Sequence, residues 1–115
     1  MKIGDLVLER TSQAVTLRAV RLPLHPIQVR ILELLMLNHG RVLTRQEILN
    51  KIWSPEQLID SRTIDVAIGR IRSALRHKVS IDPIRTIRGV GYAIDEHFGQ
   101  VASLPKKGRT MRKAQ

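Results

Sequence analysis

The sequence contains no cysteine among its 115 residues, and only one residue each of phenylalanine, tryptophan and tyrosine. Without cysteine, a disulfide scaffold, a thiolate metal site and a cysteine nucleophile are all excluded. No apolar run approaches the roughly 20 residues that span a bilayer, and residues 1–10 lack the longer apolar stretch of a signal peptide. These absences predict a soluble, cytoplasmic protein with no membrane partner.

Acidic residues are also scarce, because 10 Asp and Glu stand against 20 Lys and Arg, for a formal charge of +10. Half of this charge lies in residues 98–115, which hold five basic residues and no acidic one. That segment has few apolar residues and no helical or strand period, so we expect a basic disordered tail. It is either a solvated extension or a nonspecific arm for anionic polymers. Residues 1–97 have the length of one domain with an aliphatic core.

Three short β-branched runs between residues 2 and 24 predict a small antiparallel sheet. Residues 25–40 predict a helix, with Pro26 at its first position and Gly40 at its C-terminal cap. This helix is apolar on several sides, so we expect it at the centre of the fold.

Two further helices and a hairpin follow. Thr44 and Glu47 have the spacing of a capping box, which opens a helix that we expect to bury Ile48, Leu49 and Ile52. The third helix is expected to begin after Asp60 or Ser61 as its N-cap. Residues 84–95 predict two strands around a glycine turn. The order of sheet, three helices and hairpin indicates an α+β fold.

The third helix has one apolar face and one face whose positive charge is not balanced. At 100° per residue, the expected core stripe consists of Ile64, Ile68, Ile71 and Leu75. The opposite face carries Arg62, Val66, Gly69, Arg70, Ser73 and His77, flanked by Arg76, with Thr63 on one shoulder and Asp65 and Arg72 on the other. A merely solvated face would interleave acids with these bases. The pattern predicts a surface that faces a polyanion, with a plain solvated basic face as the alternative.

Two residues on this outer face are unusual for a solvated helix. Val66 is apolar, and Gly69 costs about 1 kcal/mol relative to alanine in a helix interior. Both are explained if a large partner approaches closely. The major groove of B-DNA admits such a helix, where arginine binds guanine and an apolar side chain meets a thymine methyl. Arg85 and Arg88 lie on the hairpin, a shape able to reach a neighbouring minor groove, so helix and hairpin together predict a winged helix.

Three segments, GRVLTRQEILNKIW, DSRTIDVAIGRIRSAL and IRTIRGVGY, resemble in order and spacing the DNA-binding effector domain of the OmpR/PhoB family of response regulators. The resemblance covers roughly residues 3–95. It implies a winged helix-turn-helix preceded by a four-stranded sheet, with the third helix in the major groove and the wing in the minor groove. It also implies tandem dimers on direct repeats of double-stranded DNA, a place at the bacterial nucleoid, and a sensor kinase that acts only through a receiver domain.

The resemblance assigns roles to individual residues as well. From the third helix, the DNA contacts would be Arg62, Thr63, Arg70, Arg72 and Ser73, with Val66 against a base methyl. Phosphates would be held with the help of Trp53, Thr86 and Tyr92, and Arg88 would enter the minor groove. The loop that would contact RNA polymerase consists of Ser54, Pro55, Glu56, Gln57 and Leu58. No cofactor and no metal is implied.

Three departures from the family pattern affect this transfer. His25 stands where the family usually has Thr or Ser, which predicts a weaker helix cap. Ala67 and Gly69 stand where several relatives carry longer polar or basic side chains, which alters the base preference. The receiver domain is absent from these residues, so the chain is interpreted as an effector domain cut from a longer protein or as a standalone regulator.

Other functions are less well supported by the residues. The four histidines, at positions 25, 39, 77 and 97, are scattered, and no metalloprotease, serine hydrolase or phosphate-loop motif is present, so no enzyme is predicted. Asp65 and Arg72 are interpreted as a structural pair on the helix shoulder. A winged helix that binds protein or RNA is the main alternative, and salt-dependent, sequence-selective binding to duplex DNA would distinguish the two.

We predict that truncation after His97 leaves the folded domain intact and lowers nonspecific DNA affinity together with its salt dependence, because the removed segment holds half the net charge. Thermal unfolding and a salt titration of DNA binding measure the two effects. A large fall in melting temperature would show that the tail packs on the domain.

Overall fold

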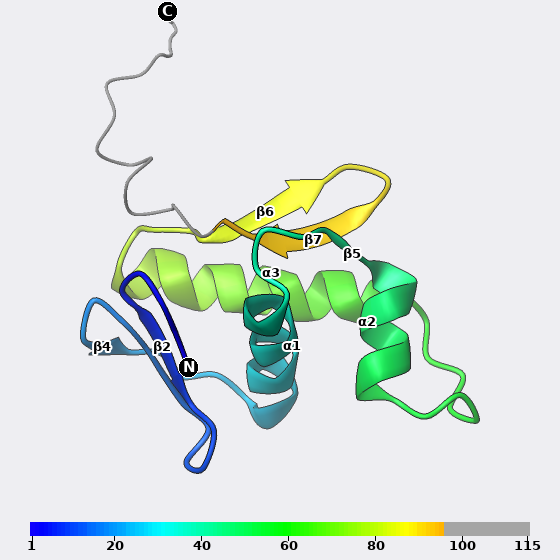
Figure 1. Ribbon diagram of the computed structural model, residues 1–115, viewed down its shortest axis with the longest axis horizontal. Helices are drawn as coiled ribbons and strands as arrows, with labels where there is room; N and C mark the ends of the chain where they lie inside the picture. The colour runs from blue at the N-terminus through cyan, green and yellow to red at the C-terminus, as the bar shows by residue number, and fades with distance from the viewer. Residues whose placement is uncertain (96–115) are drawn as a thin grey trace, which may run out of the picture.

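The computed structural model describes residues 1–95, and the predictions about the tail and about residues 96 and 97 lie outside this range. Two small sheets flank three helices (Figure 1). The elements are β1 Lys2–Ile3, β2 Leu6–Glu9, β3 Ala14–Leu17, β4 Val20–Arg21, α1 Pro26–Leu37, β5 Leu43–Thr44, α2 Arg45–Ile52, α3 Arg62–Lys78, β6 Ile84–Ile87 and β7 Gly91–Ile94. This arrangement confirms the predicted α+β winged-helix architecture.

The N-terminal sheet has strand order β1-β2-β3-β4, and all its pairs are antiparallel. Leu6 pairs with Leu17 and Leu8 pairs with Val15, and all four side chains are buried. Because side chains alternate across a strand, the intervening residues face outward. The sheet therefore covers one end of the core with a single apolar face, and its antiparallel pairing is as predicted.

Helix α1 is central and begins at Pro26, as predicted. The backbone N–H of His25 donates to the buried side chain of Gln28 at 3.0 Å, which satisfies one donor at the helix start. The C-terminal cap is Asn38, so the prediction of Gly40 was wrong by two residues. Gly40 instead has φ of +79° and donates its N–H to the carbonyl of Ile94 at 3.2 Å, because the chain turns there toward β5.

Helix α2 begins with the predicted capping box. The N–H of Glu47 donates to the Thr44 hydroxyl at 3.0 Å, and the N–H of Thr44 donates to the Glu47 carboxylate at 2.8 Å. The hydrogen bond from the Thr44 backbone, together with the Thr44 side chain and the nearby charge of Arg41, holds the pKa of Glu47 below its ordinary value. Ile48 is buried as expected, whereas Ile52 is only half-buried, since it lies in the last turn beside the exposed loop.

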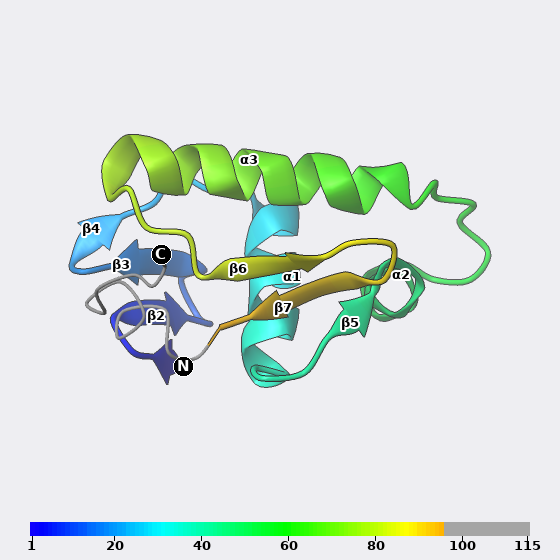
Figure 2. The same ribbon diagram turned by 90° about the horizontal axis from the view of Figure 1, so that it is seen from above.

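Helix α3 begins at Arg62, whose N–H donates to the carboxylate of Asp60 at 2.9 Å. All four residues of the predicted apolar stripe are at most 1% exposed, and Ala67 is buried beside them. In both views the N-terminal sheet lies at the C-terminal end of α3, and the tip of the β6–β7 hairpin lies near its N-terminal end (Figure 2). None of the helices within residues 1–95 has the length and apolar character needed to cross a bilayer.

The second sheet has the order β5-β7-β6, and its β6–β7 hairpin is the predicted wing. Strand β5 was not predicted, because two residues carry no detectable alternation. Gly91 faces Thr44 in the β5–β7 pair, and a Cβ atom at Gly91 would collide with the carbonyl oxygen of Leu43. Glycine is therefore required at this position for β5 to approach β7 closely.

We predict that Gly91→Ala lowers the free energy of unfolding by about 1 to 3 kcal/mol, because the added methyl must displace backbone atoms of β5. Gly69→Ala is the matched control, since a Cβ there meets no atom within 4 Å and the change raises helix propensity by about 1 kcal/mol. Denaturant unfolding of both variants measures the contrast. Equal stability of the two variants would contradict the close approach at Gly91.

Candidate nucleic-acid interface

The outer face of α3 is exposed and positively charged. Its exposed residues are Arg62, Thr63, Val66, Gly69, Arg70, Arg76 and His77, with Ser73 half-buried among them. Within residues 1–95, the guanidinium groups of Arg62 and Arg70 have no ion-pair partner. The predicted orientation of the helix is therefore correct, and its arginines are available to an external anion.

Core packing accounts for neither of the two unusual residues on this face. Val66 is 54% exposed although it is apolar. Gly69 is exposed, and a Cβ atom built there would meet open space. A small residue at 69 therefore leaves a shallow position on the helix surface between Val66 and Ser73, where a flat or grooved partner can come close to the backbone.

The shoulder of α3 that faces the wing holds Asp65, which joins three elements. Its Oδ1 accepts from the Tyr92 hydroxyl at 2.6 Å and from Arg45 Nε at 2.7 Å. Partial burial acts to raise the pKa of Asp65, but the hydrogen bonds from Tyr92 and Arg45 outweigh it and hold the pKa below its ordinary value. Burial and the Asp65 carboxylate raise the pKa of Tyr92, so its hydroxyl stays protonated and donates.

Arg72 lies on the same shoulder but does not pair with Asp65, so the predicted Asp65–Arg72 pair was wrong. Its Nε donates to Asp82 Oδ2 at 2.8 Å, and its Nη2 donates to the carbonyl of Ile84 at 2.8 Å. Arg72 therefore connects α3 with the first residue of β6. Two turns of helix separate Asp65 from Arg72, which is too far for a direct ion pair.

The wing presents its tip to solvent. Thr86 and Arg88 are exposed, and Gly89 has φ of +73° in the turn, which the N–H of Val90 closes by donating to the carbonyl of Ile87 at 2.9 Å. Tyr92 differs from this pattern, because it is only 5% exposed and belongs to the core. Sequence reasoning did not detect its contact with Asp65, since 27 residues separate the two.

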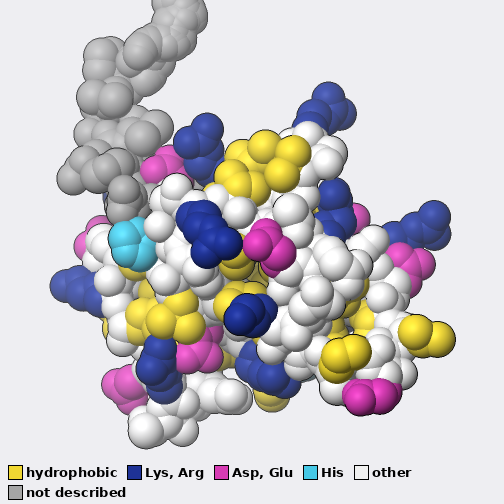
Figure 3. All heavy atoms as spheres, turned by 45° about the vertical axis from the view of Figure 1, so that its right-hand side comes forward, with side chains coloured by type: hydrophobic (Ala, Val, Ile, Leu, Met, Phe, Trp, Pro, Cys, Tyr) yellow, Lys and Arg dark blue, Asp and Glu magenta, His cyan; other side chains and the backbone are white. Residues whose placement is uncertain are grey.

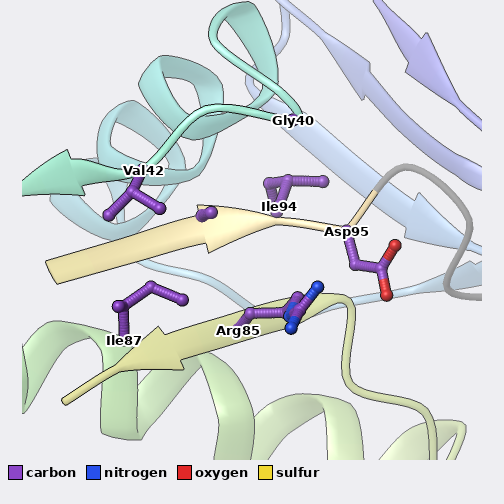
Figure 4. Close-up of a pocket in the computed structure, with 7 residues that line it drawn as sticks. Gly40, Val42, Arg85, Ile87, Ile94 and Asp95 are labelled. Atoms are coloured by element: carbon purple, nitrogen blue, oxygen red, sulfur yellow. The ribbon is translucent and has the colours of Figure 1, made fainter.

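Arg85 lies on another part of the wing than Arg88. The outer side of the β5-β7-β6 sheet has a shallow hollow of about 410 Å³, and Arg85 and Asp95 lie at the same end of it (Figure 4). Ile87 and Val42 line the other end. Arg85 therefore sits away from the tip. Within residues 1–95, no three His, Cys, Asp or Glu side chains are placed to hold a metal ion.

The loop between α2 and α3 forms a second exposed region, which leads into the N-terminal end of α3 (Figure 1). Trp53 caps α2 and is half-buried, and the loop residues after it are Ser54, Pro55, Glu56, Gln57 and Leu58, all exposed. Leu58 is 97% exposed. Separated Lys and Arg side chains are spread over the side of the molecule that carries this loop and the wing tip (Figure 3). The loop therefore adjoins the start of α3, where the predicted DNA contacts Arg62 and Thr63 are exposed.

The sequence is similar to a family of transcriptional regulators and to individual members of it. The sequence profile of the family described as "Transcriptional regulatory protein, C terminal" matches residues 19–94. The phosphate regulon transcriptional regulatory protein PhoB of Rhizobium meliloti is 39% identical over 95 residues, which are 83% of this chain and 42% of that protein. The chain thus spans about two fifths of the length of the curated relatives it matches.

Solved structures agree with this match. DrrB of Thermotoga maritima, described as an OmpR/PhoB homolog, superposes with a TM-score of 0.67 at 33% identity, covering 83% of this chain and 43% of DrrB. The DNA-binding domain of response regulator AdeR, solved in complex with an intercistronic region, has a TM-score of 0.74 at 22% identity, with coverage of 83% and 98%. With the profile match over residues 19–94, these relatives show that the chain belongs to the OmpR/PhoB family, as a C-terminal DNA-binding domain of a response regulator.

Proposed function

We propose that this domain binds double-stranded DNA with sequence preference and thereby controls transcription as the effector domain of a two-component response regulator. One observation carries the proposal: the outer face of α3 exposes arginines without ion-pair partners around Val66 and Gly69, beside a wing with an exposed arginine at its tip. Helix α3 lies in the major groove and the wing in the adjacent minor groove.

Different residues of α3 contact different groups of the bases in this proposal. Arg70 is at the middle of the exposed face, where a guanidinium can donate two hydrogen bonds to guanine O6 and N7. Val66, one turn earlier, is placed to contact a thymine methyl group. Arg62 and Thr63, at the start of the helix, and Ser73, further along, complete the contacts that we propose from α3.

Contacts with DNA phosphates and with the minor groove lie on either side of the outer face of α3 in this proposal. Arg88 enters the minor groove, which attracts arginine most strongly where A-tracts make it narrow. Thr86 on β6 and Trp53 at the end of α2 contact phosphates on either side. Arg72 and Tyr92 are not included in this set, because their polar groups bind Asp82, Ile84 and Asp65 within the domain.

Further partners follow from the family. The exposed loop Ser54–Leu58 contacts RNA polymerase in this proposal, with Leu58 as its apolar tip. A sensor kinase would act through a receiver domain, which these 115 residues do not include. The protein works in the bacterial cytoplasm at the nucleoid, and two copies bind tandem direct repeats.

We predict different effects for two arginines. Arg70→Ala should remove about 1 to 3 kcal/mol of discrimination at one base pair of a site selected from a random duplex library. Arg88→Ala should keep the major-groove consensus and lose affinity chiefly for sites flanked by A-tracts. The measurement compares the affinities for the consensus, a single-base variant and a version with G·C flanks at fixed salt.

Arg21→Ala provides the control, since Arg21 is exposed on β4 in the N-terminal sheet, and its loss removes one charge without touching either reading element. This variant should lower the affinity for all three duplexes by the same small factor. If Arg70→Ala and Arg88→Ala behaved like Arg21→Ala, both arginines would only neutralise phosphates, and the reading assignment would be wrong.

A further prediction concerns the association of the domain with itself. The domain should be a monomer in solution and pair only on DNA, since the proposed pairing follows the spacing of the repeats. Sedimentation of the free protein, and of its complexes with duplexes that carry one or two repeats, should give one and two bound copies respectively. A stable dimer at micromolar concentration without DNA would contradict this prediction.

A further inference from the structure

One shoulder of α3 is hydrogen-bonded to the wing at two points. Asp65 and Arg72 are seven residues apart, which is two helical turns, so they lie on the same side of α3 about 10 Å from each other. Asp65 accepts from Tyr92 on β7, and Arg72 donates to the carbonyl of Ile84 at the start of β6. Each strand of the wing is therefore tied to the helix by a different residue.

The first point also includes α2. Arg45 occupies the first position of α2, where the helix dipole disfavours a cation. Its Nε nevertheless lies 2.7 Å from Asp65 Oδ1, and its guanidinium carbon lies 5.6 Å from the centre of the Tyr92 ring. Arg45, Asp65 and Tyr92 thus form one joint between α2, α3 and the wing.

The second point fixes the segment that leads into the wing. Asp82 accepts from Arg72 Nε through Oδ2 and from the N–H of Ile84 through Oδ1, at 2.8 and 2.9 Å. The Arg72 side chain is 22% exposed, so its stem packs along the domain. The side chains of Arg72 and Asp82 therefore leave β6 little freedom to turn at its first residue.

We propose that these five residues, Arg45, Asp65, Arg72, Asp82 and Tyr92, form a wing clamp that sets the wing tip at the distance from the outer face of α3 needed to reach two adjacent grooves at once. Pairing with β5 holds the base of the wing, and the two points on α3 fix the angle between the wing and the helix. The residues of the clamp are positioning residues and act on DNA through Arg88. This inference rests on the proposed DNA-binding function.

Asp65→Asn and Tyr92→Phe test the clamp with little change of shape. Asp65→Asn removes an acid beside the DNA-facing surface, so charge alone would tighten binding to every duplex. The clamp predicts instead that both variants lose most of the preference for A-tract flanks over G·C flanks, while discrimination at the base pair read by Arg70 is kept. Ile31→Val is the control for a loss of stability alone, because Ile31 is fully buried in α1 and its side chain forms none of the hydrogen bonds of the clamp; this variant should keep the flank preference.

A double-mutant cycle shows whether the clamp acts through Arg88. Arg88→Ala should lower affinity for A-tract-flanked sites about tenfold in the wild-type background and only about twofold together with Tyr92→Phe. Fully additive effects, or an unchanged flank preference in both clamp variants, would overturn the clamp.

An equal loss of affinity for all duplexes in the Tyr92→Phe variant would also overturn it, because Tyr92 would then be a phosphate contact. If the wild-type domain bound no duplex selectively, the proposed function itself would fail, which is a different result from additive effects in a selective domain.

Discussion

The burial of one stripe of α3 is the constraint on which the rest of the structure depends. Ile64, Ile68 and Ile71 are at most 1% exposed, and burying each such side chain stabilises the fold by about 1.5 to 3 kcal/mol. Rotating the helix by a single residue would turn it by 100° and bring a charged residue toward the core. The orientation of α3 is therefore fixed by its apolar side, and the basic side must face outward.

The elements around α3 use this fixed helix as a reference. Helix α1 packs against it from below, and the N-terminal sheet covers the opposite end of the core from the wing tip (Figure 1). Gly91 lets β5 lie close to β7, so the wing has a third strand at its base. The polar shoulder of α3 then holds the wing at Tyr92 and Ile84. Stability comes from one side of the helix, which leaves the other side free to vary with the DNA sequence that is read.

Local signals in the sequence predicted much of this architecture. The spacing of Thr44 and Glu47, the apolar period of α3 and the glycine turn of the wing each depend on residues close in sequence, and all were confirmed. Apart from the cap of α1 and the short strand β5, the errors concern contacts between distant residues. Asp65 meets partners 20 and 27 positions away, and the partners of Arg72 lie on the segment after α3, so no helical periodicity could identify them.

In the candidate site, too, the sequence predicted which residues are exposed but not which contacts they make within the domain. Exposure of Arg62, Arg70 and Val66 followed from the helical period alone, whereas the individual DNA roles came from the family resemblance and stay predictions. For Tyr92, the structure shows a residue of the core whose hydroxyl donates to Asp65, where the resemblance implied a phosphate contact. A role carried over by sequence position thus has to be compared with the hydrogen bonds that the side chain already makes.

Methylation interference on a selected duplex tests the central claim most directly, because dimethyl sulfate modifies guanine N7 in the major groove and adenine N3 in the minor groove. With α3 and the wing in adjacent grooves, N7 methylation of guanines in the core of the site should block binding, and so should N3 methylation of adenines in the flank. Binding that tolerates both modifications and depends only on salt would contradict the account, since it would show contact with phosphates alone.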